Sequence, residues 1–211
     1  MKGYKAFNPD LTCLGYQFTA NRTHIYHGKP ILCKQGFHFC TTLEDIVKYS
    51  HQPDMRVFEI EAGGTITGTE DDCSKRACSE IRLIKEISLN EVMFSITKPQ
   101  TAYLWAKKIG DKDIMINRIA NRITESKWAY EWARDIGNQD IMINYITDSQ
   151  FSFWWAEGIG NQDIMIDRIT ESEYAYKWAK NIGNKDIMKP KVTEPYWIKE
   201  WNYWFTNDEI K

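Results

Sequence analysis

Three residue types are each missing from one part of the sequence. No tryptophan occurs before Trp105, and no cysteine or histidine occurs after Cys78, although the chain has 9 Trp, 5 Cys and 4 His in 211 residues. Such a partition is not expected of one uniform domain. It indicates two regions with different side-chain chemistry, joined in one chain.

The chain also lacks an excess of charge. It has 27 Lys and Arg against 29 Asp and Glu, for a formal net charge of -2. By count, residues 1–96 hold 11 basic and 12 acidic residues and the remainder holds 16 and 17, so neither half is basic. Binding to phosphate backbones depends on concentrated positive charge. We therefore expect no nucleic-acid partner.

Long apolar runs are absent too. A membrane-spanning helix needs about 20 apolar residues, and no stretch approaches that length; nor does an apolar signal core follow Met1. The cysteines are odd in number and form no Cys-x-x-Cys pair, which favours reduced thiols over disulfides. We expect a cytoplasmic protein with no membrane partner.

Residues 97–211 contain an internal repeat. Trp132, Trp155, Trp178 and Trp201 are spaced by 23 residues, and a four-residue insertion at 120–123 lengthens the interval from Trp105 to Trp132 to 27. The apolar spacing within each unit predicts a short first helix that ends at a glycine such as Gly183. A second short helix follows, begun by the recurring Asp residues, which are Asp113, Asp140, Asp163 and Asp186.

Helices this short are not stable alone, so stacking of neighbouring units must form the core, as in an α-helical solenoid. Most aromatic rings are then core residues, and Ser172 is the expected N-cap of its helix. Some rings exceed what one apolar stripe needs. Either they cap the end of the solenoid or they form an exposed patch that binds a partner; the candidates for partner binding are Trp128, Trp154, Trp197, Trp201 and Trp204.

Residues 1–96 predict an α+β domain. Short segments at 3–7, 35–40, 56–62 and 81–88 read as strands, separated by Asn-Pro, Gly-Lys-Pro and Gly-Gly. Residues 41–50 predict a short helix capped by Thr41 or Thr42. Thr97-Lys98-Pro99 is the expected junction, since Pro99 disfavours a helical conformation at Lys98.

The histidines and cysteines of this domain raise the hypothesis of a zinc site. His38 and Cys40 lie two residues apart on one strand face, Cys33 precedes them, and Cys73 and Cys78 lie further along the chain. The irregular spacing favours the alternative that these cysteines are buried or free thiols. We therefore assign no metal ligand and keep a zinc-binding module as a third hypothesis.

Two resemblances add to this picture. The segments "KGYKAFNPDLTC" and "CKQGFHFC" resemble the opening domain of uncharacterised phage and prophage proteins, where variable repeats often follow. That resemblance covers residues 2–88. It implies an origin in a phage and a location in the cytosol of its bacterial host, without an activity.

The second resemblance is weaker, and it is to the ADP-ribosyltransferase fold. "QGFHFCTTLEDIVKYS" is similar to the strand and helix of that fold, and "ACSEIRLIKEI" is similar to its later glutamate-bearing strand. The resemblance implies NAD as cofactor and Glu80 as the carboxylate that opposes positive charge on the ribose. The implied catalytic residues are Glu80, His38 and Tyr49, and the implied cofactor-binding residues are Gly36, Phe37, Phe39 and Lys5.

Two functions follow as hypotheses. The first is a phage-encoded interaction protein that binds, and inhibits, a host or defence macromolecule through the aromatic surface of the repeats. The alternative is an NAD-dependent ADP-ribosyltransferase whose repeats select the target. The enzyme hypothesis requires the residues implied by the second resemblance to meet in one cleft.

Overall fold

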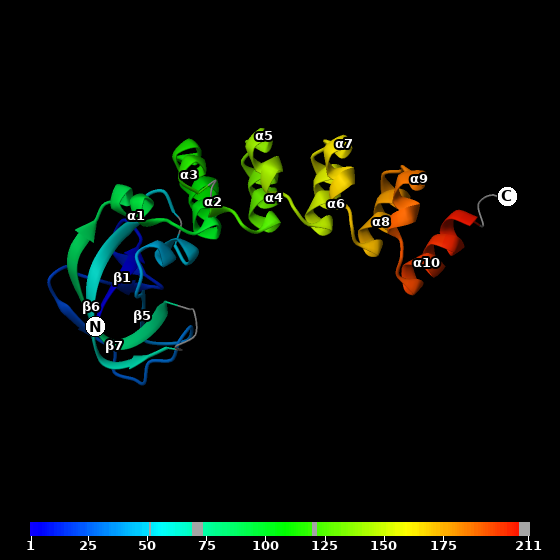
Figure 1. The fold of residues 1–211 in the computed structure, drawn as a ribbon. Coiled ribbons are helices and arrows are strands. Elements are labelled where there is room, and N and C mark those ends of the chain that lie inside the picture. Colours follow the sequence, from blue (N-terminus) through cyan, green and yellow to red (C-terminus); the bar gives the residue numbers. More distant parts are fainter. Residues whose placement is uncertain (51, 69–73, 120–121, 207–211) are drawn as a thin grey trace. The chain divides into compact units, whose positions relative to one another are not determined.

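The computed structural model describes residues 1–50, 52–68, 74–119 and 122–206. They form two compact units, residues 1–122 and 123–211. The N-terminal unit is a β-rich domain followed by helices, and the C-terminal unit is a series of short helices packed in pairs (Figure 1). Within the described ranges, no helix has the length and apolar character needed to cross a membrane.

The N-terminal unit is built on an antiparallel sheet that closes on itself. Its strands lie in the order β4-β7-β5-β1-β6, and β6 also pairs with β7. The strands β7, β5, β1 and β6 therefore form a ring around one core. The strand bounds are β1 Lys2–Phe7, β4 Thr23–Ile25, β5 Phe37–Cys40, β6 Arg56–Thr67 and β7 Lys75–Ile87, with β2 Thr12–Cys13 and β3 Tyr16–Gln17 forming a separate pair.

Four of the strands were predicted, but β6 and β7 are longer than expected. The Gly-Gly dipeptide was expected to separate strands, whereas β6 continues through Gly63 and Gly64. Gly64 has φ +62°, and the β6–β7 register shifts between Gly63 and Ile66. A β-bulge bends the strand at this point. The curvature lets one half of β6 pair with β1 while the other half lies opposite the β5 end of β7.

Aromatic side chains dominate the core of this ring. Phe7 packs edge to face on both Phe18 and Phe58, with ring centroids 5.0 and 5.8 Å apart. Such edge-to-face pairs add to the stabilisation from burial. The cluster consists of Phe7, Phe18, Phe37, Phe39, Phe58, Ile60, Ala62, Cys78, Ile81 and Leu83.

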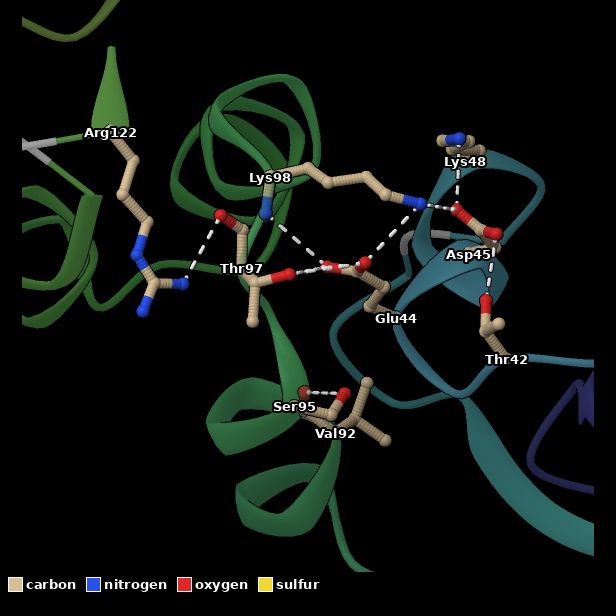
Figure 2. Close-up of polar contacts among 9 residues, drawn as sticks. All are labelled: Thr42, Glu44, Asp45, Lys48, Val92, Ser95, Thr97, Lys98 and Arg122. Carbon is tan, nitrogen blue, oxygen red and sulfur yellow. Dashed lines mark hydrogen bonds and ion pairs between the residues drawn. The ribbon is translucent and has the colours of Figure 1, made fainter. Parts of the chain in front are cut away.

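The helix predicted at 41–50 is a short 3-10 helix, η1 (Glu44–Lys48), and Thr42 does not cap its backbone. The Thr42 hydroxyl instead donates to Asp45 Oδ2 at 2.7 Å. Glu44 bonds to the start of a helix that lies far along the chain. Its Oε2 accepts from the backbone N–H of Thr97 at 2.8 Å and of Lys98 at 3.3 Å (Figure 2). It thereby supplies the cap that the Lys98 side chain does not give to helix α2 (Pro99–Lys108).

This contact fastens the first helices to the sheet domain. Helix α1 (Leu89–Ser95) is followed by α2 (Pro99–Lys108) and α3 (Lys112–Ile119). Lys98 Nζ lies 3.3 Å from both Glu44 Oε1 and Asp45 Oδ1 (Figure 2), and Arg118 Nη2 donates to the carbonyl of Phe94 at 2.7 Å. The compact unit accordingly runs to Arg122, beyond the expected junction at Thr97.

Three helix pairs and a final helix make up the C-terminal unit. The pairs are α4 (Ser126–Asp135) with α5 (Gln139–Met142), α6 (Ser149–Gly158) with α7 (Gln162–Met165), and α8 (Ser172–Asn181) with α9 (Lys185–Met188). The 3-10 turns η3 (Ile143–Tyr145), η4 (Ile166–Arg168) and η5 (Lys189–Lys191) follow them, and α10 (Pro195–Trp201) continues into the π-helical turn η6 (Asn202–Thr206). The predicted helix pairs are confirmed.

Each pair turns on a Gly-Asn dipeptide. Gly160 has φ +121° and Asn161 φ +53°, and the same geometry recurs at Gly137-Asn138 and Gly183-Asn184. The Gly160 N–H bonds back to the Trp155 carbonyl at 2.9 Å, which closes the first helix. Trp132, Trp155 and Trp178 are fully buried beneath these turns, as the aromatic stripe predicted.

Serine residues link successive pairs, in a role different from the one predicted. Ser172 is the first residue of α8, and Glu171, not Ser172, is the N-cap. The Ser172 hydroxyl oxygen instead accepts from the N–H groups of Thr193 and Glu194 in the next unit, at 2.9 and 3.1 Å. Ser126 and Ser149 make the same two bonds. Pro99 and Pro195 occupy the corresponding positions of the first and last repeats.

Candidate functional site

The N-terminal unit contains a cavity of about 470 Å³. Strands β1 and β5, helix η1 and the loops around them supply its walls. The lining comprises Tyr4, Lys5, Ala6, Phe7, Asn8, Thr12, Cys13, Leu14, Cys33, His38, Phe39, Cys40, Ile46, Tyr49, Ser50, Gln52 and Lys75. Two lysines and one histidine belong to this set, and it includes no Asp or Glu among the described residues.

Lys5 is the most unusual of these residues. The side chain comes from the core-facing side of β1, and the residue is only 7% exposed. Its Nζ donates to the His38 carbonyl at 2.8 Å and lies 5.5 and 5.7 Å from the ring centroids of Phe7 and Phe18. Within the described ranges no carboxylate pairs with Lys5. A buried ammonium ordinarily has such a partner.

His38 lies on β5 beside Lys5. Its Nε2 is buried and has no hydrogen-bond partner among the described residues. Burial lowers the pKa of His38, and the positive charges of Lys75 and Lys5 lower it further. The imidazole is therefore neutral at pH 7, and one of its nitrogens carries a proton while the other accepts.

Lys75 was not predicted as a site residue. It is the first residue of β7, and its Nζ lies 4.3 Å from the Tyr49 ring centroid. The sequence places it 26 residues from Tyr49, between Ser74 and Arg76, so no local pattern marked it. Only the pairing of Lys75 with Cys40 across β5 and β7 brings it to the cavity.

The residues implied by the ADP-ribosyltransferase resemblance do not all meet there. Lys5, His38, Phe39 and Tyr49 line the cavity, whereas Gly36, Phe37 and Glu80 do not. Phe37 is in the aromatic core, and Gly36 has φ +90° in close contact with Pro30.

Strand register explains the position of Glu80. His38 pairs with Ala77, and Glu80 follows three residues later on β7, opposite Ile25 and Gly63. Three residues of strand span about 10 Å, and an odd separation turns the side chain to the other face of the sheet. The single cleft that the enzyme hypothesis requires is therefore not formed.

The residues of the zinc hypothesis do line one cavity. Cys33, His38 and Cys40 are all in its walls. Even so, in the part of the chain that the structure describes, no three His, Cys, Asp or Glu side chains come together as metal ligands. Cys33 is exposed, and Cys40 is buried. Cys78 does not line the cavity, and Cys73 lies outside the described residues.

A second candidate site is formed by aromatic side chains on the first helix of each repeat in the C-terminal unit. Rings of successive helices contact one another: Tyr130 with Phe151 at 5.7 Å, Phe153 with Tyr174 at 6.2 Å, and Tyr176 with Trp197 at 5.3 Å between centroids. Trp154 joins the first of these pairs, 6.0 Å from Tyr130 and 5.0 Å from Phe151. We call these seven residues the aromatic ladder.

The five tryptophans proposed for partner binding divide between surface and core. Trp154 is 37% and Trp204 44% exposed, and Trp128 and Trp197 are half-buried. Trp201 is only 6% exposed and packs on Phe205, with centroids 4.5 Å apart. It occupies the repeat position of the core tryptophans, so the assignment of Trp201 to an exposed patch does not fit this structure.

Charged side chains beside the ladder are largely paired with one another. Arg134 covers the Tyr130 ring and forms ion pairs with Glu131 and Asp135. Lys177 covers Tyr174 and pairs with Glu173. Of the ladder residues, Phe153 and Tyr176 are buried and the other five are at least partly exposed.

The comparisons with known proteins concern the first half of the chain. Residues 1–95 match the model of a domain of unknown function, DUF7666. No curated protein and no solved structure matches the chain. The matched segment covers the strands β1–β7 and helix α1, and it stops before the repeat helices begin at Pro99.

Proposed function

We propose that this chain is an interaction protein whose helical repeats bind a protein partner through the aromatic ladder. The observation that carries the proposal is that rings of successive first helices, α4, α6, α8 and α10, contact one another in three separate groups, with Trp154 exposed at 37%. Solenoid repeats supply extended binding surfaces, and tryptophan and tyrosine are the residues that most often dominate interface energy.

The resemblance of the opening residues to phage and prophage proteins supports a narrower proposal. The partner is then a host or defence protein, and binding inhibits it. The ladder consists of Phe, Tyr and Trp side chains alone, and binding is the activity that we propose for the repeats.

Affinity capture from a bacterial lysate, followed by titration of the purified partner, tests the proposal. The informative variants are Trp154→Ala and Tyr130→Ala. The matched control is Ile164→Ala, since Ile164 is 42% exposed on α7 and outside the ladder. We expect each ladder variant to weaken binding at least 30-fold, corresponding to about 2 kcal/mol for an interface hot spot, while the control binds like the wild type.

Capture of the same proteins by the wild type and by the Trp154→Ala Tyr130→Ala double variant, with equal affinity, would contradict the proposal. Circular dichroism of each variant separates loss of binding from loss of folding. The control variant also shows whether any exposed apolar residue has the same effect.

A further inference from the structure

We propose that the cavity of the N-terminal unit binds a small organic phosphate with a flat ring, of the nucleoside monophosphate class. The proposal is independent of the repeats and involves no bond cleavage. It rests on the buried Lys5, on the unpartnered Nε2 of His38, and on cavity walls that hold lysines but no carboxylate among the described residues.

The charge of the cavity is the first argument. Lys5 and Lys75 both line it, and no acidic residue does so among the described residues. In a chain with a net charge of -2, two lysines without lining carboxylates form a local excess of positive charge. A ligand that brings negative charge into this space would be attracted to it.

The burial of Lys5 sharpens this argument. Its Nζ has three N–H donors, and the His38 carbonyl accepts one of them at 2.8 Å. A buried ammonium with one neutral acceptor has lost much of its hydration. Phosphate oxygens would accept the remaining donors in charge-assisted hydrogen bonds, which are stronger than neutral ones.

The second, independent observation is the unpartnered Nε2 of His38. This atom is buried, and nothing in the described part of the chain bonds to it. Buried polar atoms in folded proteins nearly always have a partner. The other ring nitrogen of His38 bonds to the backbone of Ile31, so the neutral ring presents Nε2 as an acceptor, and Nε2 would accept a hydrogen bond from a sugar hydroxyl of the ligand.

The volume of the cavity and its aromatic walls indicate that the ligand carries a flat ring besides its phosphate. The Tyr49 ring lines the cavity and is 47% exposed, with Lys75 above it, whereas Phe39 lines the cavity but is buried in the core. Aromatic faces stack on heterocyclic bases with little preference among them. A volume of about 470 Å³ lies within the range of small-molecule sites, and it suits one ring with one phosphate.

Isothermal titration of the full chain with adenosine monophosphate tests the proposal. Adenosine and inorganic phosphate are titrated separately as the two halves of that probe. We expect the monophosphate to bind more tightly than either half. Lys5→Met and Lys75→Met should each weaken its binding about 10-fold or more, as expected for the loss of a charge-assisted hydrogen bond.

Lys85→Met is the matched control, because Lys85 is also on β7, lies outside the cavity and pairs with Glu91. It should bind like the wild type. Thermal unfolding of Lys5→Met provides a second readout: replacing a buried ammonium by an apolar side chain of similar length should leave the melting temperature equal or higher. If Lys5→Met does not fold, Lys75→Met and its control carry the test.

Three results would overturn the proposal. They are no binding of the monophosphate to the wild type, equal binding to the wild type and both lysine variants, and binding of adenosine as tight as that of the monophosphate. Inorganic phosphate binding as tightly as the monophosphate would overturn the assignment of a flat ring.

Discussion

The hydroxyl oxygen of Ser149 lies 2.9 Å from the backbone nitrogen of Thr170, and Ser149 is 1% exposed. The same oxygen accepts from the N–H of Glu171 at 3.2 Å. One side chain thus satisfies two backbone donors that belong to the following repeat. The bond recurs at the two neighbouring repeats, so polar contacts join the helix pairs in addition to the tryptophan core.

Replacing this serine should loosen the C-terminal unit. Ser149→Ala removes the acceptor of two backbone N–H groups, and at about 0.5–1.5 kcal/mol for each hydrogen bond we expect a loss of about 1–3 kcal/mol in the free energy of unfolding. Urea denaturation followed by circular dichroism measures it. Gln150→Ala, one residue further along the same helix, is the control and should change stability by less than about 0.5 kcal/mol. Equal stabilities of the two variants would show that the serine bonds contribute nothing net.

Two glycines at the end of α6 should respond in opposite ways to alanine. Gly160 has φ +121° and open space around its Cβ position, so Gly160→Ala meets only backbone strain and should cost about 1–2 kcal/mol. Gly158 is helical, and its added Cβ would lie 3.7 Å from the Tyr130 hydroxyl, an ordinary contact. Gly158→Ala should stabilise by about 0.5–1 kcal/mol. Melting temperatures that move in the same direction would refute the assignment of left-handed geometry at Gly160.

Asp45 should make the N-terminal unit sensitive to acid. Burial alone would raise the pKa of Asp45, but hydrogen bonds from Lys48 and Thr42, together with the charge of Lys48, lower it well below the ordinary value. A depressed pKa stabilises the fold above the unfolded-state value near 3.9, and this contribution is lost as the pH falls below it. Asp45→Asn should therefore be less stable than the wild type at pH 7, by a margin that shrinks below about pH 4.

Urea denaturation at a series of pH values from 7 downward measures that margin. Asp54→Asn serves as the control because Asp54 is exposed, and its effect should stay small at every pH. A constant difference between wild type and Asp45→Asn across the series would contradict the prediction.

The thiols should differ in reactivity. Burial raises the pKa of the Cys78 thiol to about 11, so almost no thiolate forms at neutral pH, and Cys78 is fully buried. Cys33 is exposed. Brief treatment of the native protein with iodoacetamide, followed by peptide mass spectrometry, should show label on Cys33 and little on Cys78. Labelling of both in denaturant is the control, and rapid native labelling of Cys78 would contradict the structure of the core.

Local patterns predicted the helix pairs well because their causes are local. Within each repeat, the apolar side chains and the glycine after the first helix lie within one or two turns of the structure that they produce. The 23-residue spacing of Trp132, Trp155 and Trp178 shows that this local pattern repeats. The role of Ser172 was missed for the opposite reason. Its partners, Thr193 and Glu194, are 21 and 22 residues away, and a serine before a helix is more often a cap.

The cavity depends even more on contacts between residues that are far apart in the sequence. Lys5, His38 and Tyr49 were singled out from the sequence and do line one space, but Glu80 does not and Lys75 was missed. Whether a residue of β7 faces that space depends on its register against β5 and β6, which the bulge at Gly64 helps to fix. No pattern in residues 75–87 alone contains that information.

The serine hydrogen bonds determine how many residues the repeat region can gain or lose at a time. The hydroxyl oxygen of each of Ser126, Ser149 and Ser172 accepts from backbone N–H groups 21 and 22 residues ahead of it, so deleting or duplicating 23 residues among them leaves each of these N–H groups with an acceptor. Pro99 and Pro195, which have no hydroxyl, sit at the corresponding positions on either side. Between these prolines, gene duplication or deletion can lengthen or shorten the repeat region in whole repeats while the sheet domain stays unchanged.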